Sequence, residues 1–326
     1  MNFFGISKIL MNIGGFNIFL GEKGDRINKH LHIIKEIFES DPKNKFNIFK
    51  EDLGRNLKKL DFIVTCGDMK IIFPDIVNQS YQYIKQSNIP HLIRDVTYLR
   101  EIPKKTGLDV NNYPRFTWNS IVPTNNNFPY DSTYDRWGEL KKKYKIDIKD
   151  YDTSGENILF LLQIPTDASL NEITFNNDNY LDFMIRSIDK ILVYTDRKII
   201  LRGHPLNAHK EKILPHLIYH YENTNRVFKS KNENLIDDFK NTKCVISFNS
   251  SATVEALLSG INVINLSKNQ PCFSAASNKI EDIEKISSPD RTEFLQKISF
   301  LHWENEELKS NEIKKYLSNL LLKNIH

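Results

Sequence analysis

Cysteine is scarce in this 326-residue sequence, which contains only Cys66, Cys244 and Cys272, far apart in the chain. An odd number of cysteines without the close spacing of metal ligands indicates neither a disulfide framework nor a zinc site, and favours a reducing compartment. We therefore predict no metal and no cofactor. An excess of one charge is also missing, since 45 basic residues face 41 acidic ones and the net charge is only +4. So mild an excess gives no reason to expect nucleic-acid binding.

The sequence has no long uninterrupted apolar run. The most apolar stretch covers residues 1–20, but Lys8, Asn12 and Asn17 interrupt it, and Gly14 and Gly15 break it. No small-residue cleavage pattern follows, so the stretch does not have the form of a signal peptide or of a transmembrane helix. We expect a cytoplasmic protein, and a peripheral contact with the inner membrane remains open.

The length and the 40% hydrophobic and 26% charged content are those of an ordinary globular protein with room for two domains. Between about residues 106 and 155 the periodicity fades, and prolines, asparagines and aromatic residues predominate. Long irregular segments inside a compact protein are usually linkers or functional loops. We place the domains at residues 1–150, including this segment, and 151–326.

Three short apolar runs in the first half, at residues 16–20, 60–65 and 89–96, are predicted strands. Helical stripes lie between them, the first around Leu31 and the second around Ile76. Alternation of strand and helix is typical of a parallel α/β sheet, so we expect a Rossmann-like first domain.

Polar residues occupy the last of these runs, namely His91, Arg94 and Asp95. Two interpretations are open. They either form a hydrogen-bonded strand end, or they face a cleft, where His91 and Arg94 would bind an acceptor and Asp95 would act as a base.

The second half has the same rhythm, with predicted strands at 157–163, 198–202, 244–247 and 261–266 and a helix at 179–193. A further helical segment, 208–221, contains Pro215, which predicts a kink or two short pieces. Two helical stretches, 290–303 and 304–322, end the chain. We therefore predict a second Rossmann-like α/β domain.

Two strand-to-helix turns in this half carry polar side chains. Arg202 and His204 follow one strand, and Asn249, Ser250 and Ser251 follow another just before a helix that stops at Gly260. Ligands bind outside the carboxyl ends of strands in open α/β sheets, and helix amino ends attract anions. The turns together favour a phosphate pocket, whereas singly they could be a helix cap and a strand-ending turn.

A His-Pro motif followed by a Ser-Ser motif resembles bacterial glycosyltransferases of GT-B fold, above all the capsule-polysaccharide β-Kdo transferases that use CMP-activated acidic sugars, and more distantly the bacterial sialyltransferases. The stretches that carry the resemblance are Gln163–Asp167, Arg202–Pro205 and Ser250–Gly260. The acidic motif of the sialyltransferases is missing. The resemblance implies two Rossmann-like domains facing each other across a cleft, with the acceptor side in residues 1–150 and the donor side in 151–326.

In those families the two motifs contact the cytidine and phosphate of the donor. The resemblance therefore implies a CMP-sugar donor, a surface-polysaccharide or glycolipid acceptor, and final helices that pack back on the first domain through residues such as Ile313 and Tyr316. We predict His204, Asp167 and Asp95 as catalytic residues, with Asp167 equally able to cap the next helix. The predicted donor-binding residues are Arg202, His204, Pro205, Asn249, Ser250, Ser251 and Glu255.

Two other functions fit the same motifs. Glycerophosphotransferases that use CDP-glycerol share this resemblance and move a phosphoryl-linked group instead of a sugar. A non-catalytic module that binds a nucleotide or a sugar would need only the fold and the pocket. Identification of the donor that is turned over distinguishes the three.

Overall fold

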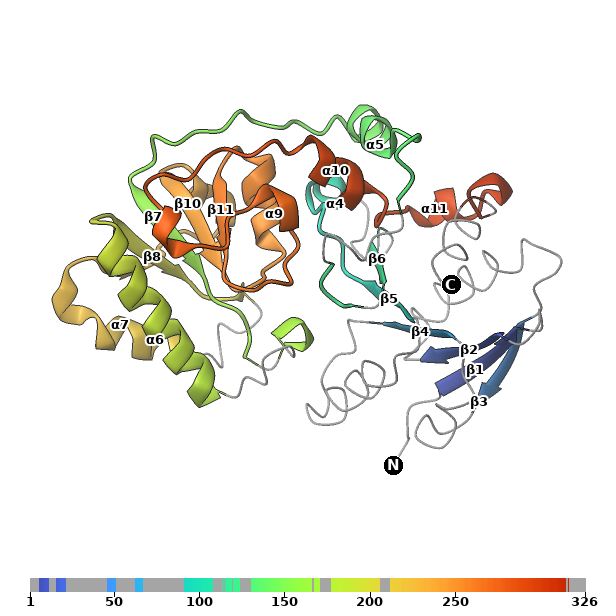
Figure 1. Cartoon of the computed structure of the whole chain (residues 1–326), viewed down its shortest axis with the longest axis horizontal. Coiled ribbons are helices and arrows are strands. Elements are labelled where there is room, and N and C mark those ends of the chain that lie inside the picture. The colour runs from blue at the N-terminus through green and yellow to red at the C-terminus, as the bar shows by residue number, and fades with distance from the viewer. Residues whose placement is uncertain are drawn as a thin grey trace. The chain divides into compact units, whose positions relative to one another are not determined.

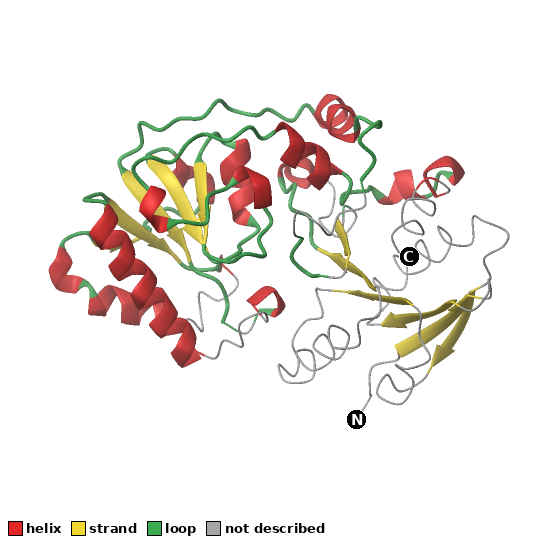
Figure 2. Cartoon of the chain, in the orientation of Figure 1, coloured by secondary structure: helices red, strands yellow, loops and turns green. Residues whose placement is uncertain are grey.

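A computed structural model of the chain is shown in Figures 1 and 2. The residues that it describes are 6–11, 16–21, 46–50, 62–66, 91–107, 113, 115–118, 120–123, 130–165, 167–170, 177–205, 212–314 and 316. The chain divides into two compact units: unit 1 comprises residues 1–144 and 296–326, and unit 2 comprises residues 145–295. Each unit contains one β-sheet, which confirms the predicted α/β class.

Unit 2 is built on five parallel strands in the spatial order β11-β10-β7-β8-β9. The strands are β7 (Asn157–Leu161), β8 (Lys198–Arg202), β9 (Val227–Lys229), β10 (Thr242–Ser247) and β11 (Asn262–Asn265). The chain moves outward from β7 through β8 to β9, then returns to the other side of β7 to form β10 and β11. Four of these strands were predicted; β9 is only three residues long and was not.

Side chains alternate between the two faces of a sheet, and in β7, β10 and β11 both faces are buried. Phe160 of β7, Ile246 of β10 and Leu201 of β8 belong to one core with helix α6 (Asn177–Tyr194) and helix α7 (Ile213–His220). These two helices lie side by side in Figure 1. The intervening residues, such as Leu159 and Val245, are buried too, and the sheet also contacts helix α9 (Ala252–Leu258). The unbroken apolar strands of the sequence reflect this double coverage.

Helix α7 accommodates Pro215 close to its amino end. The helix begins at Ile213, so Pro215 lies in its first turn, where a backbone N–H would have no intrahelical acceptor. The start of the predicted segment, residues 208–211, lies outside the described residues. Among the described helices, none is both long and apolar enough to cross a membrane.

Unit 1 contains a six-stranded sheet in the order β3-β1-β2-β4-β5-β6. Its strands are β1 (Ile6–Met11), β2 (Phe16–Gly21), β3 (Phe46–Lys50), β4 (Phe62–Cys66), β5 (His91–Asp95) and β6 (Arg115–Trp118). The predicted strands β2, β4 and β5 are confirmed and are parallel to one another. The helices predicted around Leu31 and Ile76 lie outside the described residues.

The sheet of unit 1 is mixed, which corrects the expectation of a purely parallel one. β1 and β3 pair antiparallel on one side, and β6 pairs antiparallel with β5 on the other. β1 and β2 are joined by residues 12–15 only, a connection that suffices for an antiparallel pair and is too short for a parallel crossover. The sequence predicts the strand 16–20 but not β1, because the polar residues Lys8 and Asn12 hide a strand signal in residues 6–11.

The end of the chain packs within unit 1 against helix α5 (Arg136–Tyr144). This last segment includes helix α10 (Thr292–Ser299), which begins in unit 2, and helix α11 (Asn305–Leu308), which follows α10. Helix α4 (Glu101–Thr106) lies earlier in unit 1. A cluster of Phe300, Trp303 and Leu308 gathers Tyr134, Ile313 and Tyr316 around it.

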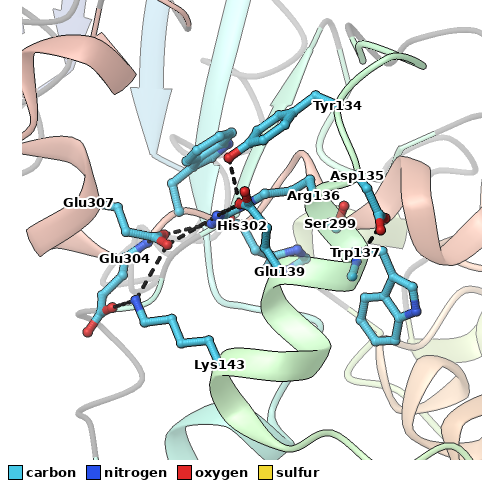
Figure 3. Close-up of polar contacts among 12 residues, drawn as sticks. Tyr134, Asp135, Arg136, Trp137, Glu139, Lys143, Ser299, His302, Glu304 and Glu307 are labelled. Atoms are coloured by element: carbon cyan, nitrogen blue, oxygen red, sulfur yellow. Dashed lines mark hydrogen bonds and ion pairs between the residues drawn. The ribbon is translucent and has the colours of Figure 1, made fainter.

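A buried ion pair fixes this arrangement (Figure 3). The guanidinium of Arg136 binds both carboxylate oxygens of Glu307, at 3.1 and 2.6 Å, and donates to the His302 carbonyl at 3.0 Å. It also lies over the Trp303 ring, 4.0 Å from the ring centroid. Arg136 is only 2% exposed, so this paired charge holds α5 and the last segment together out of water.

His302 completes the same joint as a neutral side chain. Its Nε2 accepts a hydrogen bond from the Tyr98 backbone N–H at 3.0 Å, so its proton is on Nδ1, which lies 2.8 Å from the Ile298 carbonyl oxygen. Burial lowers the pKa of His302 to about 3. The ring is therefore uncharged at neutral pH, and it connects the Tyr98 backbone to the segment that follows α10 by hydrogen bonds.

We predict that Glu307→Gln destabilises the protein by about 3 kcal/mol at neutral pH, because it leaves the Arg136 charge buried without its counter-ion. Burial alone would raise the pKa of Glu307, but the hydrogen bonds and charge of Arg136 outweigh burial and lower it below the ordinary 4.5. A lowered pKa in the folded state gives stability that is complete above pH 4.5 and disappears as the pH falls through the folded value. The difference between wild type and variant in denaturant unfolding should therefore shrink below pH 4.5.

The matched control is Glu306→Gln, the neighbouring carboxylate on α11, which pairs with Lys309 while 71% exposed. It should unfold like the wild type. Equal unfolding free energies of Glu307→Gln and Glu306→Gln at neutral pH would contradict the role of the buried pair.

Candidate functional site

The candidate site lies at the carboxyl edge of the sheet in unit 2. The strand order reverses between β7 and β10, so the connections that leave these two strands run in opposite directions across the sheet. Open α/β sheets bind ligands at this position. The turns that follow β7, β8 and β10 carry the residues predicted from the sequence.

Gln163 and Asn249 bridge the reversal point directly. Gln163 Nε2 donates to Asn249 Oδ1 at 2.8 Å, and the Asn249 backbone N–H donates to Gln163 Oε1 at 3.0 Å. Asn249 Nδ2 donates in turn to the Ser169 carbonyl at 2.7 Å. Both side chains are buried, at 6% and 3% exposed. The two turns are therefore held at a fixed separation.

In the Ser-Ser turn, Ser250 forms hydrogen bonds both with a side chain of β10 and with the amino end of α9. The Ser250 backbone N–H donates to Ser247 Oγ at 3.1 Å, and Ser250 Oγ accepts from the Ala252 N–H at 3.3 Å. Ser251 is the residue before α9, and its side chain makes no capping hydrogen bond. The helix-cap alternative thus describes Ser250 and does not describe Ser251. Glu255 lies on α9 and is buried.

Buried polar side chains next to this turn form hydrogen bonds with one another. Ser247 Oγ donates to Asn265 Oδ1 at 3.2 Å, and Asn265 Nδ2 binds Gln270 Oε1. Cys272 Sγ lies 3.2 Å from Thr253 Oγ1, and burial raises its pKa to about 12. Its thiol is therefore protonated at neutral pH and is no nucleophile.

Arg202 is held in a structural ion pair. Its Nη1 lies 2.5 Å from Asp238 Oδ2 and 3.0 Å from the Asn232 carbonyl, and its Nη2 lies 2.6 Å from the Glu233 carbonyl. Asp238 is a residue of helix α8 (Leu235–Phe239), and its side chain is 3% exposed. The guanidinium thus ties the end of β8 to the loop after β9, and contact with a donor phosphate stays a prediction for this residue.

His204 and Pro205 follow β8 at the same edge of the sheet. His204 is partly exposed and Pro205 is exposed. β7 separates β8 from β10, and neighbouring strands are spaced by about 4.8 Å, so the His-Pro and Ser-Ser turns leave the sheet about 10 Å apart. A sugar with its phosphate spans a comparable length.

Asp167 lies at the start of the short 3-10 helix Ala168–Leu170. Its Oδ1 accepts from the Ser169 N–H at 2.8 Å and from Ser169 Oγ at 2.6 Å. The sequence left a cap of the next helix open beside the role of a base; the cap belongs to this short 3-10 helix and not to the predicted helix at 179–193. The side chain is partly exposed, so the cap and contact with a ligand are compatible.

The acceptor-side candidates all lie on β5 of unit 1. The Asp95 carboxylate binds the Arg115 guanidinium and accepts from the Val96 N–H at 2.7 Å. Arg115 also donates to the carbonyls of Val96 and Ile121, at 2.8 and 2.7 Å. These contacts are those of a hydrogen-bonded strand end. The side chains of His91 and Arg94 lie outside the described residues, and their acceptor role stays a prediction.

No family model and no curated protein matches the sequence. Among solved structures, the chain is similar to the β-Kdo 2,4-transferase of Thermosulfurimonas dismutans KpsC, with 13% identity, a TM-score of 0.42, and coverage of 74% of this chain and 80% of that one. The β-Kdo 2,7-transferase of the same protein gives 14% identity, a TM-score of 0.41, and coverage of 90% and 96%. The UDP-GlcNAc 2-epimerase of Methanocaldococcus jannaschii gives 15% identity, a TM-score of 0.28, and coverage of 93% and 83%.

Sequence reasoning missed two partners in this region. Gln163 was read as part of a motif and not as a site residue, although a polar side chain directly after a buried strand is the same signal that identified His204. Asp238 gave no signal, because it precedes no motif and its pairing with Arg202 spans 36 positions. Among the described residues, no group of three or more His, Cys, Asp or Glu side chains could hold a metal.

We predict that Arg202→Ala lowers the free energy of unfolding by about 3–5 kcal/mol, because Asp238 would remain buried without its cation. Denaturant unfolding followed by circular dichroism measures the loss. Arg197→Ala is the control: Arg197 pairs with Glu284, which is 40% exposed, so about 1 kcal/mol or less should be lost. An Arg202→Ala protein as stable as Arg197→Ala would mean that the ion pair is not structural.

Proposed function

We propose that the protein is a glycosyltransferase that moves an acidic sugar from a CMP-activated donor onto a surface-polysaccharide or glycolipid acceptor. One observation carries the proposal: Asp167, His204 and Ser251 lie on the turns after β7, β8 and β10, which all leave the same carboxyl edge of the parallel sheet. The resemblance of the His-Pro and Ser-Ser motifs to the β-Kdo transferases supports the choice of donor.

The reaction makes a bond between an acceptor oxygen and the anomeric carbon, and breaks the bond from that carbon to the phosphate oxygen. CMP leaves with the electron pair, and the acceptor hydroxyl loses its proton to a base. Groups that stabilise the phosphate as its charge grows accelerate this step, because their interaction is stronger in the transition state than in the ground state. We assign that role to His204 and to the hydroxyl of Ser251, with the α9 amino end behind them.

The base is assigned to Asp167. Its partly exposed carboxylate lies on the turn after β7, between the His-Pro and Ser-Ser turns in the order of the strands. A carboxylate within hydrogen-bond reach of the acceptor hydroxyl is the usual device for removing its proton. The Ser169 hydrogen bonds hold this side chain in place and occupy Oδ1.

We expect CMP to raise the melting temperature of the protein more than UMP or GMP does. A ligand present at a hundredfold excess over its dissociation constant stabilises by about 2.7 kcal/mol. The panel also includes CDP and CDP-glycerol, and turnover is assayed with CMP-sugars and with CDP-glycerol. Release of CMP from a CMP-sugar supports the proposal. Turnover of CDP-glycerol alone would identify a glycerophosphotransferase, and binding of CMP without any turnover would identify a binding module.

We expect His204→Ala to lower single-turnover CMP release roughly 100- to 1000-fold, the range seen when one donor to a transition-state charge is removed. Its melting temperature should change little. The control is His216→Ala on α7, an exposed imidazole whose Nδ1 lies 2.6 Å from the Lys212 carbonyl oxygen. Near-normal CMP release from folded His204→Ala protein would remove His204 from the reaction. Loss of stability with normal release would make it a residue that ties loops together.

A further inference from the structure

The Gln163–Asn249 pair also connects the turn of Asp167, the turn of Ser250 and helix α6. Through the Ser169 carbonyl, Asn249 contacts the turn that Asp167 caps, and through its own backbone it is continuous with Ser250. The Gln163 backbone N–H donates to the Tyr180 hydroxyl at 2.8 Å, which anchors the pair on α6. The turn of Asp167 and the turn of the serines are therefore linked by one chain of hydrogen bonds.

The hydrogen bonds themselves determine how both amides are oriented. Asn249 accepts with Oδ1 and donates with Nδ2, while Gln163 donates with Nε2 and accepts with Oε1. A flip of either amide would place two donors or two acceptors against each other. With only 3% of Asn249 exposed, its side chain has little capacity left for a ligand.

We infer that Gln163 and Asn249 are positioning residues that set the separation between Asp167 and the Ser250–Ser251 turn. The inference rests on the proposed function, which assigns those two turns to the base and the phosphate. It replaces the predicted donor contact of Asn249 by an indirect role. Misplacement of catalytic groups by about 1 Å can cost a hundredfold in rate, so a rigid connection between the two turns matters for turnover.

Asn241 provides a matched control, because it joins the same two strands at their opposite ends. The Glu156 backbone N–H donates to Asn241 Oδ1 at 3.0 Å, and Asn241 Nδ2 lies 3.5 Å from Glu156 Oε2. Glu156 precedes β7 and Asn241 precedes β10. Asn241→Ala therefore removes an amide bridge between β7 and β10 without touching the carboxyl edge.

The test compares Gln163→Ala, Asn249→Ala, the double variant and Asn241→Ala by amide hydrogen exchange and by single-turnover CMP release. Asn249→Ala should speed exchange roughly tenfold in residues 164–170, and Gln163→Ala should do so in residues 249–254, each across the bridge from the substitution. CMP release should fall roughly ten- to a hundredfold in each single variant, and no further in the double variant, since either change breaks the same connection. Asn241→Ala should alter neither region.

Two results would overturn the inference. One is faster exchange confined to the turn that carries the substitution. The other is an additive loss of CMP affinity in the double variant, which would make both residues direct and independent donor contacts. If a truncation prevents folding, Gln163→Glu and Asn249→Asp keep the side-chain volume, reverse one hydrogen-bonding group each, and should show the same exchange pattern. A wild type that neither binds CMP nor releases it would refute the proposed function, while the exchange data would still decide whether the turns are coupled.

Discussion

Five parallel strands in unit 2 are subject to one geometric constraint: all their carboxyl ends meet at the same edge. A parallel strand must be entered from the opposite edge, so each connection crosses the sheet, and the reversal of strand order between β7 and β10 sends neighbouring connections apart. The central strands β7 and β10 and the edge strand β11 are almost completely buried, so the polar side chains that they carry, such as Ser247 and Asn265, are paired inside the fold. Partly exposed polar groups are found mainly on the residues that follow the strands, and every candidate of unit 2 except Glu255 and Arg202 lies there.

Most polar side chains at this edge form contacts that hold the fold together. Arg202 is balanced by Asp238, Ser250 caps α9, and Gln163 and Asn249 satisfy each other. Each group would be costly to bury alone, so its partner is a condition for the fold. His204, Ser251 and Asp167 keep part of their surface exposed. Each motif therefore contains both residues that hold the fold together and residues that are candidates for the reaction.

The sequence predicted the buried strands well because their signal is local. Short runs rich in Ile, Leu and Val, each closed by a turn residue, identify β7, β8, β10 and β11 without knowledge of their neighbours. The partners of the polar residues could not be predicted in this way. Arg202 finds Asp238 36 positions later, Gln163 finds Asn249 86 positions later, and Arg136 finds Glu307 171 positions later. Each pairing depends on how segments far apart in the sequence pack against each other, which single residues do not encode.

Unit 2 is one uninterrupted stretch of chain, while unit 1 is assembled from both ends of the sequence. During synthesis, residues 145–295 leave the ribosome before Glu307, the counter-ion of Arg136, does. Since domains fold as units while the chain lengthens, unit 2 can complete its core first. Until the last segment arrives, unit 1 carries a guanidinium without its counter-ion and the uncovered apolar surface of α5. A stop codon shortly before residue 307 would therefore leave unit 2 folded and unit 1 incomplete.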